Sequence, residues 1–292
     1  MKRPDQRLRP AINFFFTLPR FGTGGKMVVI GVSVVAFLIV MTVAAPLVSP
    51  HNPTQLSLGP AAAAPSWRFP MGTNYLGEDI LSRLIYGGST MMEVAALTVL
   101  ICFAIGVPLG LFSGYSRRAI DGVISLVMDS IYAFPGLVLA IAIAAVLGRG
   151  VVNLSIAIAV VYIPTYFRVV RSQVLSIKEL PYVEAVKTEG GGLLNILFRQ
   201  ILPNVIPSIA VVASINVADA VITEAGLTYL GLGVNPAVPD WGYAILYGKT
   251  LFFAGAWWAW LFPGIMVILL AGGFTLIGEG LSEVLSPRLG KR

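Results

Sequence analysis

The chain has 292 residues, of which 57% are hydrophobic and only 12% are charged, with a formal net charge of +6. Soluble domains carry about 25% charged residues, so this composition excludes an ordinary soluble protein and indicates an integral membrane protein. The chain has one cysteine, Cys102, and one histidine, His51. This count excludes a disulfide framework and predicts no metal site. We expect His51 to be a solvated loop residue.

Six apolar runs are long enough to cross a hydrocarbon core of about 30 Å as helices. Helices are favoured because backbone polar groups in lipid must be paired within their own segment. The predicted spans are 27–48, 90–114, 122–147, 153–170, 205–227 and 256–277. The sequence thus predicts an all-α membrane protein. Its parts are a tail at 1–26, an external segment at 49–89, a core of five helices at 90–277 and a tail at 278–292.

The positive charges are unevenly divided between the two sides of these spans. Of the 20 Lys and Arg residues, only four fall on the side opposite the two chain ends: Arg68, Arg83, Arg149 and Lys249. Loops rich in Lys and Arg stay in the cytoplasm. We therefore expect both termini to be cytoplasmic, and the net charge needs no nucleic-acid partner. The first span is too long for the apolar part of a signal peptide, so we expect it to be retained.

One charged stretch, PYVEAVKTEGGGLLNILFRQILPN at 181–204, interrupts the apolar sequence between the fourth and fifth spans. It favours a helix, a turn at the three glycines, and a second helix that Pro203 ends. Four apolar residues of the second helix repeat at helical spacing and predict one buried face: Leu194, Leu197, Phe198 and Ile201. We expect a cytoplasmic helix-turn-helix that offers one part to a partner. An ordinary amphipathic connector is the alternative.

Polar side chains inside the spans are costly, so they are expected to face protein or water. Asn216, Asp219 and Thr223 share one stripe of the fifth span, with Glu224 about a quarter-turn away. Asp129 lies in the inner part of the third span. These residues are candidates for a translocation path. The alternative is that they hold neighbouring helices together.

Two external segments are candidates for partner contact. Residues 78–86 predict a short interfacial helix, in which Asp79 and Arg83 pair at i, i+4, or else a plain amphipathic lead-in to the second span. The loop at 228–255, which contains Asp240 and Trp241, is long enough to meet an external protein. Phosphate-binding, metalloprotease and Ser-hydrolase motifs are absent from the sequence, so no catalytic residues are predicted.

The 181–204 stretch resembles the EAA loop of ATP-binding-cassette (ABC) importer permeases. Its residues Glu184, Ala185, Gly190, Leu202 and Pro203 stand at the spacing of that motif, whereas Val186 and Gln200 depart from it. The resemblance implies a coupling loop at 171–204 that docks on an ATPase subunit and transmits its closure. The implied coupling residues are Glu184, Ala185, Lys187, Gly190, Gly191, Arg199, Leu202 and Pro203.

The resemblance runs from about residue 27 to the end. Stretches such as MGTNYLGEDILSRLIYGG at 71–88 and TEAGLTYLGLGV at 223–234 are similar to the second, C-type permease of dipeptide, oligopeptide and nickel importers. Asn74 and Glu78 depart from the expected acidic and basic residues. The resemblance implies a type I importer permease of a prokaryotic plasma membrane. Its partners would be a homologous second permease, two ATPase subunits that bind ATP and Mg, and an external substrate-binding protein.

The substrate implied by this resemblance is a di- or oligopeptide, with nickel chelates, glutathione and oligosaccharides as alternatives. The chain itself is expected to hold no cofactor and to be no enzyme. An ion-coupled secondary carrier or channel is the rival from another class, because the spans contain ionisable residues. A carrier is disfavoured because repeated, interrupted half-helices are not evident in the sequence. An intramembrane enzyme lacks a nucleophile or metal constellation.

Overall fold

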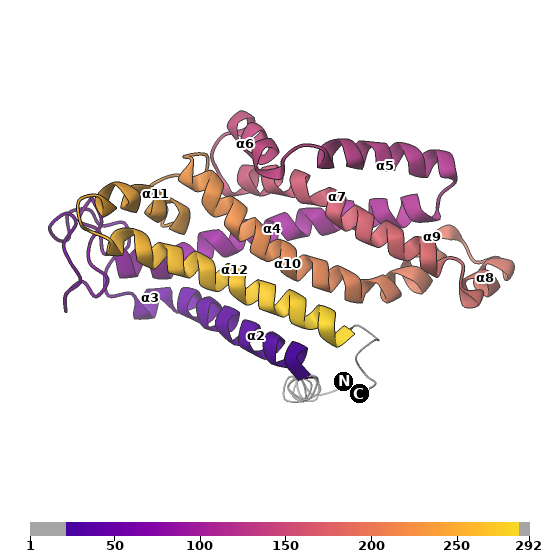
Figure 1. Ribbon diagram of the computed structural model, residues 1–292, viewed down its shortest axis with the longest axis horizontal. Helices are drawn as coiled ribbons and strands as arrows, with labels where there is room; N and C mark the ends of the chain where they lie inside the picture. The colour runs from indigo at the N-terminus through magenta and orange to yellow at the C-terminus, as the bar shows by residue number, and fades with distance from the viewer. Residues whose placement is uncertain (1–21, 286–292) are drawn as a thin grey trace.

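The computed structural model describes residues 22–285, which are helical apart from the connecting loops (Figure 1). The predicted tails at 1–21 and 286–292 lie outside the described residues. The helices are α2 (Gly22–Val43), α3 (Ala45–Val48), α4 (Ile80–Tyr115), α5 (Arg118–Tyr132), α6 (Gly136–Leu147), α7 (Val151–Ile177), α8 (Pro181–Thr188), α9 (Leu193–Asn195), the π-helix η2 (Ile196–Ile201), α10 (Leu202–Tyr229), α11 (Trp241–Phe252) and α12 (Trp258–Leu285).

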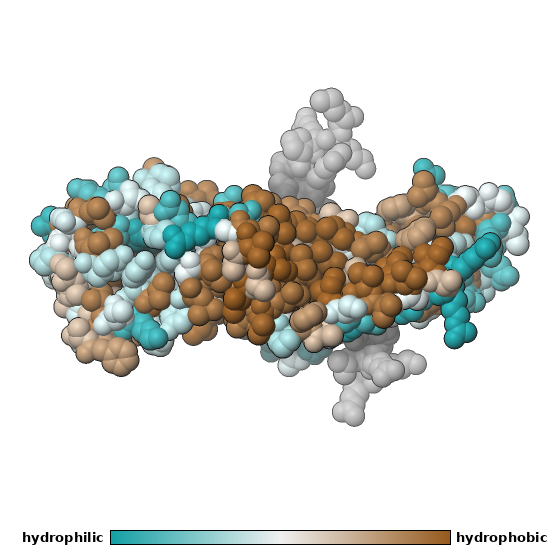
Figure 2. Space-filling model, turned by 90° about the horizontal axis from the view of Figure 1, so that it is seen from above, coloured by the Kyte–Doolittle hydropathy of each residue, from teal (hydrophilic) through white to brown (hydrophobic). Residues whose placement is uncertain are grey.

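Five helical segments are long and apolar enough to cross a membrane: α2, α4, α7, residues 193–229 and α12. The pair α5–α6 bends by 89° at residues 133–135 and makes a sixth span if it is counted as one. Figure 2 shows an apolar belt across the middle of the molecule, with hydrophilic residues towards both ends. The predicted all-α membrane fold is confirmed, and its third span is a broken helix.

The second span is longer than the sequence predicts. The helix α4 has 36 residues and is therefore about 54 Å long, well beyond the hydrocarbon core of about 30 Å. Residues 80–86 form its first two turns, so they are no separate interfacial helix. The fourth span is also longer, because α7 continues to Ile177 and includes the start of the predicted 171–204 loop.

The helices α4 and α7 approach closely along a seam of glycines. A Cβ on Gly106 would lie 2.7 Å from the Cβ of Tyr166, and one on Gly110 would lie 2.8 Å from the backbone oxygen of Phe167. Gly114 meets Val174 in the same way. Small residues at four-residue spacing let two backbones pack tightly in a membrane, where dispersion contacts replace the hydrophobic effect. This seam joins the C-terminal part of α4 to α7.

The remaining spans pack around this pair. The helix α2 lies along α12, α10 packs on α12, α4 and α7, and α11 rests on α12 and α10 (Figure 1). The buried apolar residues form two clusters. One includes Leu84, Leu227 and Trp241, and the other joins α4 and α7 to Val183 and Ile201.

The long axis of the molecule separates two ends. The loop end consists of residues 49–79 and 230–257, including α11, and the opposite end carries α8 (Figure 1).

Candidate functional site

The segment after α7 folds as a helix, a turn and a second helix, as predicted. Pro203 does not end the second helix, because residues 193–229 continue as one helical segment in which Pro203 stands in the first turn of α10. We name residues 178–204 the hairpin segment. Pro181 stands in the first turn of α8, where its missing N–H is not needed. Glu184 lies in that first turn and Lys187 in the last, which suits the helix dipole. Gly190 then takes a φ of +85°, a conformation that favours glycine, and the chain reverses into α9.

The helix α8 touches the rest of the subunit mainly through Val183, whose side chain is buried in the cluster of α4 and α7. Glu184, Ala185 and Lys187 are exposed. A hollow of about 360 Å³ lies beside them, lined also by Tyr115, Lys178 and Glu179. Three of the eight predicted coupling residues are thus outward-facing on a small helix that is anchored at its centre.

The return helix corrects the predicted buried face. Leu197 and Ile201 are buried, but Leu194 and Phe198 are 70% and 48% exposed. The cause is the π-helix η2, whose wider turns break the spacing of an α-helix. Its last bond runs from the N–H of Leu202 to the oxygen of Leu197, and it directly precedes Pro203, whose ring would clash with a carbonyl in a regular α-helix.

This wider turn leaves a second outward surface on the hairpin segment. Leu194, Asn195, Phe198 and Arg199 line a shallow hollow on it. Of the predicted coupling residues, Arg199 and Pro203 are exposed and Gly191 and Leu202 are half-buried.

The polar residues of the spans divide into different environments. Thr223 on α10 lies 3.0 Å from the hydroxyl of Tyr162 on α7, and Asp219 is half-buried on the same helix. Asn216 and Glu224 are buried, and the carboxylate of Glu224 accepts a hydrogen bond from Thr228 at 2.9 Å. The α10 stripe is therefore only partly accessible.

Two ion pairs attach α5 to α7. Arg168 donates to Asp129 at 2.7 Å and lies over the ring of Tyr132. Arg171 donates twice to Asp121 at 2.6 Å. Asp129, the α5 residue of the first ion pair, is exposed. The Asp121 pair was not found in the sequence, because its partners are 50 residues apart and no local spacing signals them.

At the loop end, Asp79 and Arg83 do not form the predicted pair. Asp79 begins α4, where its Oδ2 accepts from the N–H of Ser82 at 3.1 Å and lies 3.3 Å from Nδ1 of His51. Arg83 donates to Glu78 at 2.7 Å. A carboxylate at the N-terminus of a helix can accept hydrogen bonds from the free backbone N–H groups of the first turn, so Asp79 caps α4. His51 is likewise half-buried in this network and is no solvated loop residue.

Asp240 and Trp241 are buried, which corrects the expectation that they face outward. Asp240 begins α11 by accepting from the N–H of Tyr243 at 3.0 Å. The indole Nε1 of Trp241 donates to the backbone oxygen of Leu84 at 2.9 Å. These contacts fix α11 against the start of α4 and leave neither side chain for a partner.

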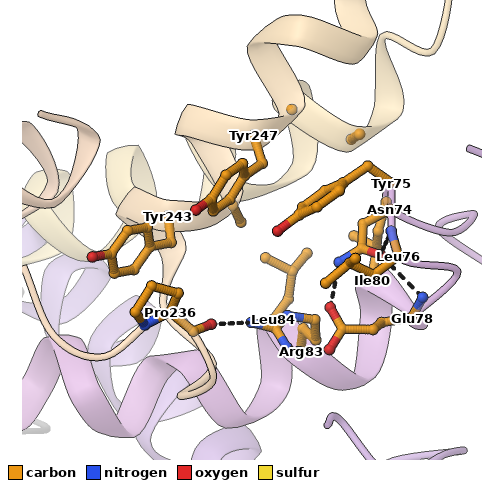
Figure 3. A pocket seen from close by; sticks show the side chains of 13 residues that line it. Asn74, Tyr75, Leu76, Glu78, Ile80, Arg83, Leu84, Pro236, Tyr243 and Tyr247 are labelled. Carbon is orange, nitrogen blue, oxygen red and sulfur yellow. Dashed lines mark hydrogen bonds and ion pairs between the residues drawn. The ribbon is translucent and has the colours of Figure 1, made fainter. Parts of the chain in front are cut away.

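A small cavity separates α11 from the start of α4 (Figure 3). Tyr75, Tyr243 and Tyr247 line one side, and the ion pair of Glu78 and Arg83 lines the other. Burial raises the pKa of the Tyr75 and Tyr243 hydroxyls, so both remain hydrogen-bond donors. The cavity measures about 40 Å³, which accommodates water and excludes a peptide. No group of three or more His, Cys, Asp or Glu suited to a metal ion occurs within residues 22–285.

The chain was compared with known proteins. The family described as "Binding-protein-dependent transport system inner membrane component" matches residues 106–291, more than half of the chain. The dipeptide transport system permease protein DppC of Alkalihalophilus pseudofirmus is 36% identical over 264 residues, which cover 90% of this chain and 86% of that protein. The DppC protein of Bacillus subtilis is 32% identical and covers 99% of this chain and 90% of its own length.

Two further similarities bear on substrate and fold. The glutathione transport system permease protein GsiD of Pectobacterium atrosepticum is 36% identical, over 80% of this chain and 76% of that protein. Among solved structures, a chain of the inward-facing MetNI methionine ABC transporter matches with a TM-score of 0.56 and 16% identity. The match covers 70% of this chain and 97% of that one. At this identity the structural match supports the fold alone.

Proposed function

This chain belongs to the family of inner membrane components of binding-protein-dependent transport systems, and we propose that it is a permease subunit that imports short peptides. The similar proteins include dipeptide, di/tripeptide and glutathione permeases, whose named substrates are all short peptides. Nickel chelates and oligosaccharides are not better supported. The observation that carries the proposal is the exposed hairpin segment at one end of a membrane-spanning core.

The orientation in the membrane follows from the charges at the two ends. Eight described Lys and Arg residues lie on the side of the hairpin segment: Lys26, Arg117, Arg118, Arg168, Arg171, Lys178, Lys187 and Arg199. The opposite side, which includes the loop end, the start of α4 and the α6–α7 connection, has Arg68, Arg83, Arg149 and Lys249. The positive-inside rule assigns the hairpin end and both termini to the cytoplasm. The loop end then faces the external binding protein.

The hairpin segment is suited to receive force from an ATPase subunit. Glu184, Ala185 and Lys187 form the exposed side of α8, whereas Val183 holds the helix to the cluster of α4 and α7. Ile196 and Ile201 join the return helix to the same cluster. A push on α8 would therefore act on the packed α4–α7 pair and move spans as rigid bodies. This is the alternating-access mechanism that the proposal requires.

The translocation path would follow the accessible side of α10, where Asp219 and Thr223 are half-buried. Asn216 and Glu224 are buried within the subunit and would shape the path from behind. ATP and Mg would be bound by two partner ATPase subunits, and a homologous second permease would complete the path. In this arrangement the chain supplies no catalytic residue of its own.

The test is Glu184→Lys in the complex reconstituted with its ATPases and binding protein. We expect loss of ATP-dependent peptide uptake and of stoichiometric ATPase co-purification, because a reversed charge would stand at the proposed docking surface. Glu279→Lys, which alters an exposed carboxylate on α12, is the matched control and should retain both properties. An ion-coupled carrier would instead tolerate Glu184→Lys and transport without ATP, and that result would refute the proposal.

A further inference from the structure

An aromatic groove lies where α10, α11 and α12 meet near the loop end. It is lined by Tyr229, Lys249, Phe252, Phe253 and Trp260 and has a volume of about 280 Å³. The helices around it are firmly joined, because Gly248 of α11 packs against the backbone of Ala259 at the start of α12, leaving no room for a Cβ. The groove thus lies between helices whose relative positions are fixed by close packing.

The aromatic rings of the groove hold each other in place. Phe252 contacts Phe253 edge-to-face, with ring centroids 5.8 Å apart, and lies 6.0 Å from the ring of Trp260. The rings are nevertheless open to the outside, since Phe253 is 82% exposed and Phe252 is 49% exposed. Apolar surface of this kind is unfavourable in water. At the end of a membrane span, it is the expected surface of the lipid interface.

Lys249 is the one charged residue that lines this groove. Its Nζ lies 5.4 Å from the ring centroid of Tyr229, and within residues 22–285 no carboxylate lies within ion-pair distance of it. Among the other cations on this side, Arg83 is paired with Glu78, whereas Arg68 and Arg149 have no carboxylate partner among residues 22–285. None of these three residues lines the groove. Lys249 therefore presents a free positive charge beside the apolar rings of the aromatic groove.

We propose that the aromatic groove binds an anionic phospholipid such as phosphatidylglycerol. Its acyl chain would lie against Phe252, Phe253 and Trp260, and its phosphate would pair with Lys249. A cation near the membrane surface attracts anionic headgroups, and aromatic rings suit the headgroup boundary. The groove shares no lining residue with the hairpin segment or with the proposed path residues of α10, and its existence does not depend on the proposed peptide substrate or orientation.

The test uses tryptophan quenching by brominated lipids in nanodiscs that hold the protein with the chains that accompany it. Trp260 lies in the groove, and its quenching is measured as the difference between the protein and its Trp260→Phe variant, which cancels the other four tryptophans of the chain: Trp67, Trp241, Trp257 and Trp258. We expect brominated phosphatidylglycerol to quench at a lower mole fraction than brominated phosphatidylcholine. Free phosphate carries no quencher, so quenching reports lipid in particular.

The variant Lys249→Gln should raise the mole fraction of brominated phosphatidylglycerol needed for half-quenching about fivefold, as expected for one surface cation. Lys249→Arg should retain the wild-type value. Arg68→Gln removes an exposed cation from the same end without touching the groove and should also leave it unchanged. Equal quenching by the two lipids, or an equal effect of Arg68→Gln and Lys249→Gln, would overturn the proposal. Loss of all quenching at Trp260 would mean that a protein partner covers the groove, and would overturn it too.

Discussion

The acidic residues of the loop end are each used inside the subunit. Asp79 begins α4, Glu78 neutralises Arg83, and Asp240 begins α11. A buried hydrogen-bond donor left without its acceptor costs about 1–3 kcal/mol. These side chains therefore fix the geometry of the loop end, and a docking protein would meet the exposed residues around them.

The buried carboxyl group of Asp240 also lies close to the buried carboxyl group of Glu224 on α10. Oδ2 of Asp240 and Oε2 of Glu224 find no donor among the described residues unless one carboxyl is protonated. Burial raises the pKa of Asp240 above its ordinary value of 3.8. A raised folded-state pKa gives stability that is present at low pH and lost as pH rises through that pKa. The join between α10 and α11 should therefore weaken with increasing pH.

We expect Asp240→Ala to lower stability by about 1–2 kcal/mol, because α11 loses its N-cap. Asp240→Asn should retain most of the stability, since its amide keeps an oxygen for the cap and can donate to Glu224. The asparagine variant should also show a smaller decline in stability with rising pH, because one of the two buried carboxyl groups is removed. Melting temperatures of the three proteins in detergent, measured from pH 4 upward, would check this. An unchanged pH dependence in Asp240→Asn would contradict the shared proton.

For individual residues, the accuracy of the sequence predictions depended on how far along the chain each residue lies from its contact partner. Glu184 and Gly190 follow a local pattern, and the predicted helix and turn were confirmed. Trp241 was expected to face outward because its partner, the oxygen of Leu84, is 157 residues away. Asp79 was misassigned for a local reason: its position just before a helix indicates a cap at least as well as an i, i+4 pair.

Among the elements, the α4–α7 seam is the most exacting contact. A Cβ at Gly110 would lie 2.8 Å from both the oxygen of Phe167 and the Cβ of Val170, so one backbone would have to move. We expect Gly110→Ala to destabilise the subunit by about 1–3 kcal/mol through overpacking. Thermal unfolding in detergent, followed by loss of monodisperse protein, would measure this.

Gly264→Ala on α12 is the matched control, because nothing lies within 4 Å of its added Cβ. It should be neutral or stabilise the helix by up to about 1 kcal/mol. If both alanine variants melted alike, the seam would not limit how closely α4 and α7 approach.

A comparison of predicted and observed helix boundaries shows which features of the helices can be predicted from the sequence. Five of the six predicted apolar runs correspond to helices long enough to cross a membrane, and the other corresponds to the bent pair α5–α6, since hydropathy alone reveals such runs. The π-helix at 196–201 was missed because the sequence shows apolar spacing but not the widened turn before Pro203. The length of α4 was missed because its polar first turns extend beyond the apolar run.

For the whole molecule, the two ends should lie on opposite sides of the membrane. Cys102 is buried, and the sequence has no other cysteine, so introduced cysteines can be labelled in the natural background. Ala64 at the loop end and Ala119 at the start of α5 are exposed, and neither substitution changes charge. We expect a membrane-impermeant maleimide to label Ala64→Cys in intact spheroplasts, and Ala119→Cys only after the membrane is permeabilised.

The reverse labelling pattern would invert the proposed orientation. It would assign the hairpin segment to the outside, where no ATPase subunit could reach it. Labelling of both positions in intact spheroplasts would instead indicate leaky membranes or misfolded protein. Misfolding would also label Cys102 in the unmodified protein, whereas a leaky membrane would leave this buried cysteine unlabelled.

The way in which α8 is held has a consequence for how such importers diversify. Val183 supplies the anchor, and the residues on its exposed side make little contact with the membrane core. Changes at Glu184, Ala185 or Lys187 would then alter which ATPase is recognised without a matching penalty in folding. Recognition of the ATPase and stability of the membrane-spanning core could then change independently. We therefore expect that an exchange of the exposed α8 residues would let this subunit pair with a foreign ATPase.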